Sequence, residues 1–319
     1  MRLYAYFSKF ERVPTVPILG YNALKPVDLK ALECLLDPEK HLSLVKFLQN
    51  KLKIDAALPL LDLTVEAQSM GAKVVFADYD APKIEGAIGM DNVGQDKSEN
   101  RMLAMIKTAE KMEDEISNIP TGFYVTGPFT AAGQIIGIGN LVKNMIRSPD
   151  AVLSLLERVT ATCFSYAKEL EDAGIDFLVI ADPSSSLISA EQFKKFSQPY
   201  LRRITSGLKL DSVLHVCGRS SHLIRDMPDA GVEAVSIDHN VPLKKAVQEV
   251  PNNILVLGNY PPSNLVFEDV STIRKNVYRM LMDVKASRNV VSSTGCDIPS
   301  NVPMRNVEAF VEASKEIKR

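Results

Sequence analysis

The chain has 319 residues, of which 46% are hydrophobic and 24% are charged, an ordinary composition for a globular protein. Its 37 Lys and Arg residues nearly balance 39 Asp and Glu residues, so no basic excess favours nucleic acid as a partner. No apolar run reaches the roughly 18 residues of a membrane helix, and four cysteines are too few for a disulfide scaffold. We therefore expect a cytoplasmic protein with reduced thiols.

Short apolar runs rich in leucine and β-branched residues recur along the chain and predict β-strands. Each run is continuous rather than alternating, which is typical of parallel strands buried on both faces. The predicted strands are Thr15–Leu19, Asp55–Leu60, Gly122–Thr126, Asp176–Ala181, Ser212–Cys217, Glu233–Ile237, Ile254–Gly258 and Asn289–Ser293.

Stretches with the apolar spacing of helices separate these strands. The clearest predicted helix runs from Ala151 to Ala173, with Ser148 as its cap, Pro149 before its first turn and Gly174 as its stop. Eight strands with intervening helices is the number found in a (β/α)8 TIM barrel. We therefore predict a single α/β domain over residues 1–319. The pattern alone leaves a doubly wound open sheet as the alternative.

Two stretches depart from the simple alternation of strand and helix. The segment from Pro26 to Asn50 predicts extra helices near the N-terminus, between the first and second strands. The segments Lys73–Ala77 and Lys83–Gly86 predict two short strands joined by a turn. We expect them to form a small hairpin inserted after the second barrel strand.

Polar residues follow most of the predicted strands. Because parallel barrel strands all end at the same face, these residues are expected to gather at one mouth. Gly, Pro, Asn and Asp are common in turns, which explains any single group. The same preference explains less well the presence of a His-x-Cys segment at one strand end and a Gly-Cys-Asp segment at another. The groups are Asp62–Glu66, Gly127–Thr130, Asp182–Ser186, His215–Gly218, Asp238–Asn240, Gly258–Asn259 and Gly295–Asp297.

The spacing of His215 and Cys217 points to a metal site. Residues two apart on a strand face the same side, so the imidazole and the thiol lie side by side. Cys296 ends the last predicted strand, which a closed barrel returns to the others. One imidazole and two thiolates are a ligand set that suits zinc, and three protein ligands leave a position open for substrate. The structural alternative is two small core cysteines and a hydrogen-bonded histidine.

The other cysteines and histidines lack such a pattern. Cys34 and Cys163 lie on apolar helical stripes, so buried structural thiols are expected. His41 lies in a polar helical run and is expected to be solvated. His239 stands at a strand end without a clear partner.

Several stretches together resemble the uroporphyrinogen decarboxylase superfamily, and within it the corrinoid methyltransferases typified by methylcobamide:coenzyme M methyltransferase. The resemblance covers nearly the whole chain from about Val13. It implies the barrel fold and a zinc ion (Zn2+) on the residues that match His215, Cys217 and Cys296. The resembling stretches are Leu63–Ala67, Met70–Gly71, Gly127–Thr130, Ile180–Ser184, Leu214–Gly218, Gly258–Asn259 and Gly295–Pro299.

The resemblance favours methyl transfer over decarboxylation. The decarboxylases share an Arg-Gln-Ala-Gly-Arg segment after the first strand, which grips the carboxylates of the porphyrinogen. The corresponding stretch here, Pro17–Asn22, has no arginine, so a polyanionic tetrapyrrole would meet little positive charge. Uroporphyrinogen decarboxylation is therefore the lesser interpretation.

In a methyl-transfer system the second reactant is the cobalt of a corrinoid (cobalamin). We expect a separate corrinoid-binding protein to carry it, because Asp238-His239 lacks the spacing and glycines of a corrinoid-binding motif. A zinc ion would lower the pKa of a bound thiol or polarise a heteroatom that carries methyl. The small substrate is either a methylated compound, such as a methyl ether, or a thiol.

Three further polar residues are candidates at this site. Glu66 is a candidate fourth, exchangeable zinc ligand, although a carboxylate at a helix start is an equally good interpretation. Asp182 and Asn259 are candidates for orienting the substrate or the ligand histidine, against a simple turn role. Tyr124 and Tyr260 are candidate pocket aromatics.

The direction of transfer stays open at this point. In the resemblance, Asp297 stands where the coenzyme M methyltransferases have the last glycine of a Gly-Cys-Gly segment, and the helix that usually precedes the first strand is short. These two differences favour transfer from a methoxylated compound to cobalt over transfer from methylcorrinoid to a thiol. A barrel that binds zinc without catalysis is the remaining alternative. A homodimer is the commonest oligomer, but the sequence does not decide this.

Overall fold

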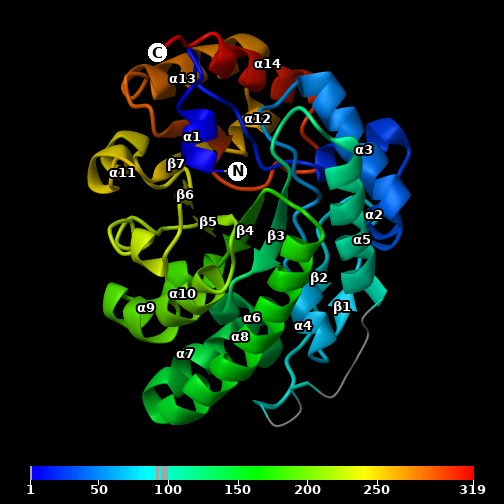
Figure 1. The fold of residues 1–319 in the computed structure, drawn as a ribbon, viewed down its shortest axis with the longest axis vertical. Coiled ribbons are helices and arrows are strands. Elements are labelled where there is room, and N and C mark those ends of the chain that lie inside the picture. Colours follow the sequence, from blue (N-terminus) through cyan, green and yellow to red (C-terminus); the bar gives the residue numbers. More distant parts are fainter. Residues whose placement is uncertain (1, 91–92, 95–99) are drawn as a thin grey trace.

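The computed structural model describes residues 2–90, 93–94 and 100–319. Six parallel strands lie in sequence order in one sheet, enclosed by helices (Figure 1). Each matches a predicted strand to within three residues at either end. The strands are β3 (Gly122–Thr126), β4 (Phe177–Ala181), β5 (Asp211–Val216), β6 (Ala234–Ile237), β7 (Leu255–Tyr260) and β8 (Val290–Thr294).

The first two predicted strands differ from the rest, because they form single bridges rather than regular strands. Thr15 bridges in parallel to Ser292 of β8, and Ala57 bridges to Thr121 beside β3. The amide N of Asp55 also donates to Thr15 O at 3.0 Å, which joins the two segments. Prolines 14, 17 and 59 interrupt the ladder because they have no N–H to donate. These bonds link the two edges of the six-stranded sheet, as a (β/α)8 barrel requires.

Helices follow the strands and cover the outside of the sheet. The longest, α8, begins at Pro149 and ends at Asp172, close to the predicted Ala151–Ala173. Ser148 is its N-cap residue but makes no side-chain capping bond. The other α-helices are α1 (Leu3–Phe7), α2 (Ala31–Leu36), α3 (Pro38–Leu52), α4 (Val65–Ser69), α5 (Asn100–Glu115), α6 (Pro128–Ile136), α7 (Ile138–Arg147), α9 (Ala190–Phe196), α10 (Gln198–Ser206), α11 (Leu243–Glu249), α12 (Asn264–Phe267), α13 (Val270–Met282) and α14 (Met304–Lys315).

Short elements complete the chain. The predicted hairpin is confirmed, since β1 (Val74–Val75) pairs antiparallel with β2 (Lys83–Ile84). It is shorter than expected at both strands. The extra N-terminal helices are confirmed as α2 and α3. The 3-10 helices are η1 (Tyr21–Ala23), η2 (Lys25–Val27), η4 (Pro183–Leu187) and η5 (Pro228–Ala230).

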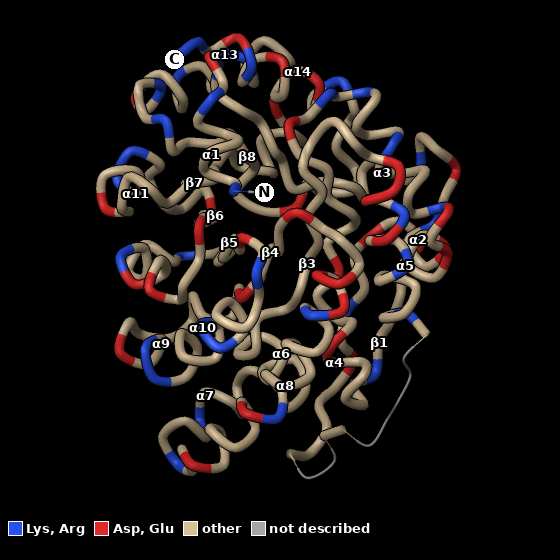
Figure 2. The backbone as a smooth tube through the Cα atoms, in the orientation of Figure 1, with Lys and Arg blue, Asp and Glu red and all other residues tan. Residues whose placement is uncertain are grey.

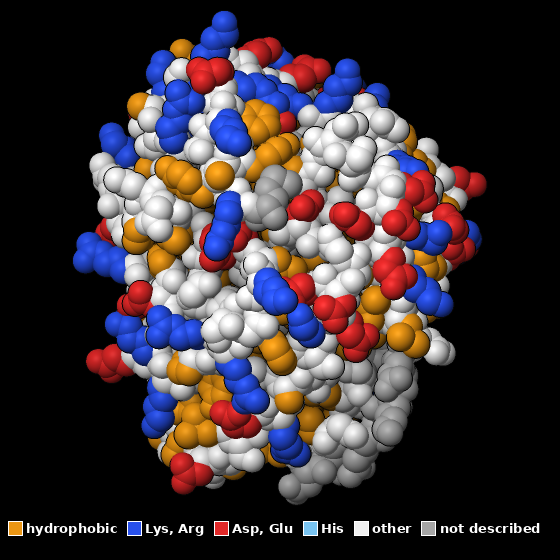
Figure 3. All heavy atoms as spheres, viewed as in Figure 1, with side chains coloured by type: hydrophobic (Ala, Val, Ile, Leu, Met, Phe, Trp, Pro, Cys, Tyr) orange, Lys and Arg blue, Asp and Glu red, His pale blue; other side chains and the backbone are white. Residues whose placement is uncertain are grey.

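The hydrophobic core has two parts, one between the sheet and the helices and one inside the ring of strands. The inner part includes Tyr124, Phe177 and Val213, and α1 adds Leu3 and Phe7 to it. The helices and loops carry most of the charged residues, and the strands have few (Figure 2). Lys and Arg are interspersed with Asp and Glu on the face in Figure 3, as the balanced composition predicts.

The N-terminal segment is fixed to the amino end of β5. The amide N of Leu3 donates to Asp211 Oδ2 at 2.6 Å, and Arg2 Nη1 donates to Asp211 Oδ1 at 3.1 Å. Asp211 is the only charged residue in β3–β8. Because α1 packs at the amino ends of the strands, the carboxyl ends are the ends left open for a binding site. No helix among the described residues is long and apolar enough to cross a membrane.

The expectation that His41 is solvated is wrong. His41 is completely buried, because it lies on the apolar stripe of α3 with Leu44, Val45 and Leu48. Its Nε2 accepts a hydrogen bond from the amide N of Leu60 at 2.9 Å. Burial lowers the pKa of His41 from 6.5 to about 3. The two buried cysteines, Cys34 and Cys163, lie in the core as predicted.

We predict that His41 makes the protein sensitive to mild acid. The folded pKa lies below that of the unfolded chain, so His41 contributes stability above about pH 6.5 and loses it as the pH falls towards 3. The free energy of unfolding should fall by up to about 1.4 kcal/mol per pH unit from this residue. Urea unfolding between pH 7 and pH 4.5 measures it. His41→Gln should flatten the slope relative to the parent, whereas the exposed His222→Gln should leave it unchanged. Equal slopes in all three proteins would contradict the assignment.

Candidate metal centre

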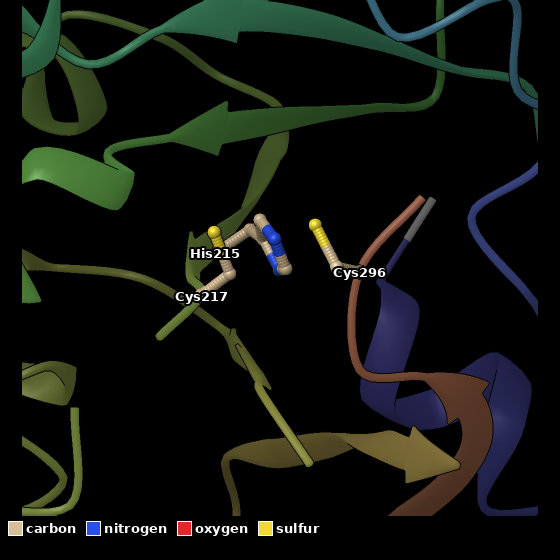
Figure 4. A group of neighbouring side chains, drawn as sticks. All are labelled: His215, Cys217 and Cys296. Carbon is tan, nitrogen blue, oxygen red and sulfur yellow. The ribbon is translucent and has the colours of Figure 1, made fainter. Parts of the chain in front are cut away.

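Three side chains from two distant parts of the chain meet at the carboxyl ends of the strands. His215 lies on β5, Cys217 follows this strand directly, and Cys296 follows β8. One nitrogen of the imidazole and the two sulfur atoms lie within 4.8 Å of one another. Figure 4 shows the three side chains converging on a common space. Among the described residues no other group of three or more His, Cys, Asp or Glu ligands has this geometry.

The two ring nitrogens of His215 have different surroundings. Its Nδ1 atom lies 2.9 Å from Ser236 Oγ on the neighbouring strand β6, and both residues are buried. A hydrogen bond donated by Nδ1–H to this oxygen leaves a lone pair on Nε2. Nε2 is buried and has no well-aligned hydrogen-bond partner among the described residues. Because an unpaired buried nitrogen is costly, a metal ion facing the two sulfur atoms fits this site.

The two thiols affect each other's ionisation. A hydrogen bond from Cys217 lowers the pKa of Cys296 to about 4, against the effect of burial, and the nearby His215 ring lowers it further. The same bond and burial raise the pKa of Cys217. The pair therefore holds one thiolate readily and a second one only at a cost. A divalent cation between the sulfur atoms would replace the proton of Cys217.

The loops that carry the two cysteines are fixed by close packing. The amide N of Gly218 donates to Asp238 Oδ2 at 2.9 Å, which ties the residue after Cys217 to the end of β6. A Cβ on Gly295 would lie 2.5 Å from the amide N of His239, so only glycine lets the segment before Cys296 approach this loop. The sequence alone identifies Asp238 as a strand-end residue and predicts no role for it.

Asn259 and Asp182 hold backbone in place in this structure. The Nδ2 of Asn259 donates to Asp238 O at 2.9 Å and to Val241 O at 2.5 Å. Asp182 accepts from the amide N of Thr130 at 2.8 Å and from the hydroxyl of Ser197 at 2.7 Å. Both carboxylate oxygens of Asp182 and the amide nitrogen of Asn259 are thus engaged. A role for them in orienting substrate stays a prediction.

Glu66 lies apart from the group of three ligands. It is completely buried at the start of α4, and its two oxygens accept from the amide N and the hydroxyl of Thr126, at 2.6 and 2.7 Å. Burial raises its pKa to about 7. To reach an ion at the cysteines, the carboxylate would have to leave Thr126. Its role as an exchangeable ligand stays a prediction.

The two candidate pocket tyrosines have different surroundings. The hydroxyl of Tyr124 is buried inside the ring of strands and has no partner among the described residues. The hydroxyl of Tyr260 donates to Glu268 Oε2 at 2.5 Å, and its ring packs against Phe310. Tyr124 is therefore the one with a free polar group.

We predict that Ser236→Ala weakens metal binding while leaving the fold intact. Loss of the hydroxyl frees the His215 ring to rotate, and such outer-shell partners are typically worth about 10–100-fold in metal affinity. Zinc titration against a competing chelator measures the change. Ser293→Ala is the matched control, because this serine is also buried on a strand but its hydroxyl has no partner among the described residues. Equal zinc affinity in the two variants would contradict the role of Ser236.

Comparison with known proteins places the whole chain in one family. It is 29% identical over 273 residues to the methylated-thiol--coenzyme M methyltransferase of Methanosarcina mazei, covering 82% of this chain and 73% of the relative. It is 27% identical to the methylcobamide:CoM methyltransferase MtbA of Methanosarcina acetivorans, covering 88% and 86%, and 28% identical to the uroporphyrinogen decarboxylase of Flavobacterium johnsoniae, covering 82% and 80%.

A solved structure confirms the fold. A methyltransferase from Methanosarcina mazei superimposes with a TM-score of 0.85 at 23% identity, over 99% of this chain and 97% of that one. The family model of uroporphyrinogen decarboxylase (URO-D) matches residues 5–317. The resemblance found in the sequence is thus confirmed, and the chain belongs to the uroporphyrinogen decarboxylase (URO-D) family of enzymes.

Proposed function

We propose that this chain is a zinc-dependent methyltransferase of a corrinoid methyl-transfer system. The observation that carries the proposal is the meeting of His215, Cys217 and Cys296, together with an imidazole Nε2 that is buried and has no hydrogen-bond partner among the described residues. The names of two relatives, both coenzyme M methyltransferases, one of them methylcobamide-dependent, support the reaction class.

The ligand set favours zinc and a catalytic rather than a structural site. Two thiolates and one imidazole are typical zinc ligands, and three protein ligands leave one position for a substrate atom. Bound zinc would supply Lewis-acid chemistry, which keeps a thiol ionised or polarises a heteroatom that carries a methyl group. The protein's own part is to orient the His215 ring through Ser236 and to fix the loop of Cys217 through Asp238.

The substrate that we favour is a small methoxylated compound, which gives its methyl group to the cobalt of a partner corrinoid protein. In this reaction the methyl–oxygen bond breaks, a methyl–cobalt bond forms, and the leaving oxygen takes up a proton. A second candidate is transfer from methylcorrinoid to a thiol, because the names of two relatives identify coenzyme M as their thiol. Both reactions place one heteroatom of the small molecule at the same three ligands.

Decarboxylation of a porphyrinogen is less well supported. The stretch from Pro17 to Asn22 has no arginine, and among its residues Tyr21 and Asn22 are buried. Tyr21 donates its hydroxyl to Leu61 O at 3.1 Å. A substrate with several carboxylates would therefore find no cation on this segment.

We predict that Cys217→Ser removes most of the bound zinc. A hydroxyl is a much poorer zinc ligand than a thiolate, so the loss of affinity should exceed the roughly 10–100-fold that an outer-shell change costs. Metal analysis after dialysis measures the zinc content. Cys34→Ala changes a buried cysteine of α2 that is not one of the three ligands, and this variant should keep the zinc of the parent. A parent protein without zinc, or a Cys217→Ser protein with as much as the parent, would refute the metal site.

We predict that the zinc-loaded protein methylates free cob(I)alamin from an aromatic methyl ether. The absorbance change from cob(I)alamin to methylcobalamin measures the reaction, and Cys217→Ser is the inactive control. The thiol candidate predicts the reverse reaction, loss of methylcobalamin when a thiol is added. The protein could also bind zinc but react in neither direction with any methyl donor or thiol offered together with the partner corrinoid protein. That result would refute the enzyme and favour a non-catalytic zinc-binding barrel.

A further inference from the structure

Tyr124 of β3 points into the ring of strands, close to the metal ligands in the register of the sheet. Tyr124 pairs with Val179 of β4, Val179 pairs with Val213 of β5, and all three belong to the inner part of the core. His215 is two residues after Val213 on β5, so its side chain faces the same side of the sheet. Tyr124 and Ser236, which holds the His215 ring, also line one small cavity of about 20 Å³ inside the ring of strands.

The hydroxyl of Tyr124 lies near a ligand sulfur as well. Tyr124 is buried, and burial is the largest cause that raises the pKa of its hydroxyl well above the ordinary value of 10. The carboxyl group of Asp297 and the sulfur of Cys296 raise this pKa further. Because the electrostatic effect of one group on another falls with distance, the hydroxyl is close to Cys296. It therefore lies near the place that an atom bound at the three ligands would occupy.

This hydroxyl is a hydrogen-bond donor without an acceptor. Its oxygen is buried and has no hydrogen-bond partner among the described residues, and a buried polar group left unpaired is costly. Because its pKa is raised, the hydroxyl keeps its hydrogen at neutral pH and stays a donor. A bound atom with a lone pair or a negative charge at the ligand group would accept this hydrogen bond.

The two candidate reactions would use such a donor differently. When a methyl group leaves an ether oxygen, negative charge builds up on that oxygen, and a preorganised donor stabilises it. When a thiolate attacks a methyl group, its sulfur loses negative charge, so a donor on the sulfur stabilises the starting state and slows the reaction. An unpaired donor beside the ligand group therefore fits the leaving oxygen of a methoxylated compound better than an attacking thiolate.

We propose that Tyr124 is a catalytic residue whose hydroxyl donates a hydrogen bond to the ether oxygen of a methoxylated substrate and stabilises this oxygen as the methyl group leaves. The electron pair of the broken methyl–oxygen bond stays on the oxygen, and a pair from the reduced cobalt forms the methyl–cobalt bond. Tyr124 keeps its hydrogen, and the product oxygen takes up its proton from water. This inference rests on the proposed function, because it assigns the ether oxygen to the zinc site.

The test compares the zinc-loaded parent with Tyr124→Phe, which removes only the hydroxyl oxygen. Methoxybenzene and 4-nitroanisole are the methyl donors to cob(I)alamin, because the nitro group stabilises the leaving oxygen without help from the protein. Removal of one such donor typically costs about 10²–10³-fold in rate. We expect Tyr124→Phe to lose at least about tenfold with methoxybenzene and no more than about threefold with 4-nitroanisole. A residue that only supports the fold would slow both ethers equally.

Binding of phenol, the product from methoxybenzene, gives a readout that does not depend on turnover. Tyr124 should donate to the phenol oxygen at the ligand group in the same way. A hydrogen bond to a charged partner is worth about tenfold or more in affinity, so the calorimetric Kd of phenol should rise about tenfold in Tyr124→Phe. The zinc content of this variant should equal that of the parent, because its hydroxyl serves the substrate and not the ligands.

Tyr166→Phe is the matched control. Tyr166 of α8 is also buried and its hydroxyl also lacks a partner among the described residues, but it belongs to the part of the core between the sheet and the helices. This variant should keep the rates and the Kd of the parent. Equal rate losses with the two ethers, an unchanged Kd of phenol, or a loss of zinc in Tyr124→Phe would overturn the inference while the proposed function stands. A zinc-loaded parent that demethylates neither ether would overturn both.

Discussion

The site depends on one buried nitrogen, Nε2 of His215, which has no hydrogen-bond partner in the described part of the chain. Ser236 fixes the Nδ1 side of the His215 ring, and one nitrogen of this ring lies within 4.8 Å of the sulfur atoms of Cys217 and Cys296. Hydrogen bonds from neighbouring strands hold the loops around this ring in place. Asp238, at the end of β6, holds the loop of Cys217. Asn259 of the neighbouring strand β7 donates in turn to the backbone of the loop after β6. A ligand nitrogen that is buried and unpaired, on a ring whose other nitrogen is held by the protein, is what a preorganised metal site looks like before binding.

The ring of strands makes this convergence possible for residues that are distant in sequence. The strands β5 and β8 are separated in the sheet by β6 and β7, and curvature brings their carboxyl ends towards one space. The bridge between Thr15 and Ser292 and the bond between Asp55 and Thr15 hold the far edges of the sheet together. The bidentate ion pair of Arg12 and Asp55, at 2.7 and 2.6 Å, anchors this junction. Fold closure and site geometry are therefore coupled, although the junction lies at the opposite end from the chemistry.

Much of this arrangement was predictable from the sequence, because continuous apolar runs identify buried parallel strands and strand ends identify the mouth. The strand Gly122–Thr126 has the same bounds in prediction and structure. What failed depends on tertiary packing. His41 looked solvated because its sequence neighbours are polar, yet its helical neighbours at three and four positions away are apolar. Ser236 and the role of Asp238 could not be predicted, since a serine within a strand or an aspartate after one is ordinary until the partner strand is known.

The contact between Cys217 and Cys296 has a consequence for how the site is loaded. The hydrogen bond between the two sulfur atoms favours the thiolate of Cys296 and the protonated form of Cys217, so it lowers the pKa of Cys296 and raises the pKa of Cys217. A divalent cation that binds both sulfur atoms must therefore expel the hydrogen ion of Cys217. Its uptake should weaken as the solution becomes more acidic.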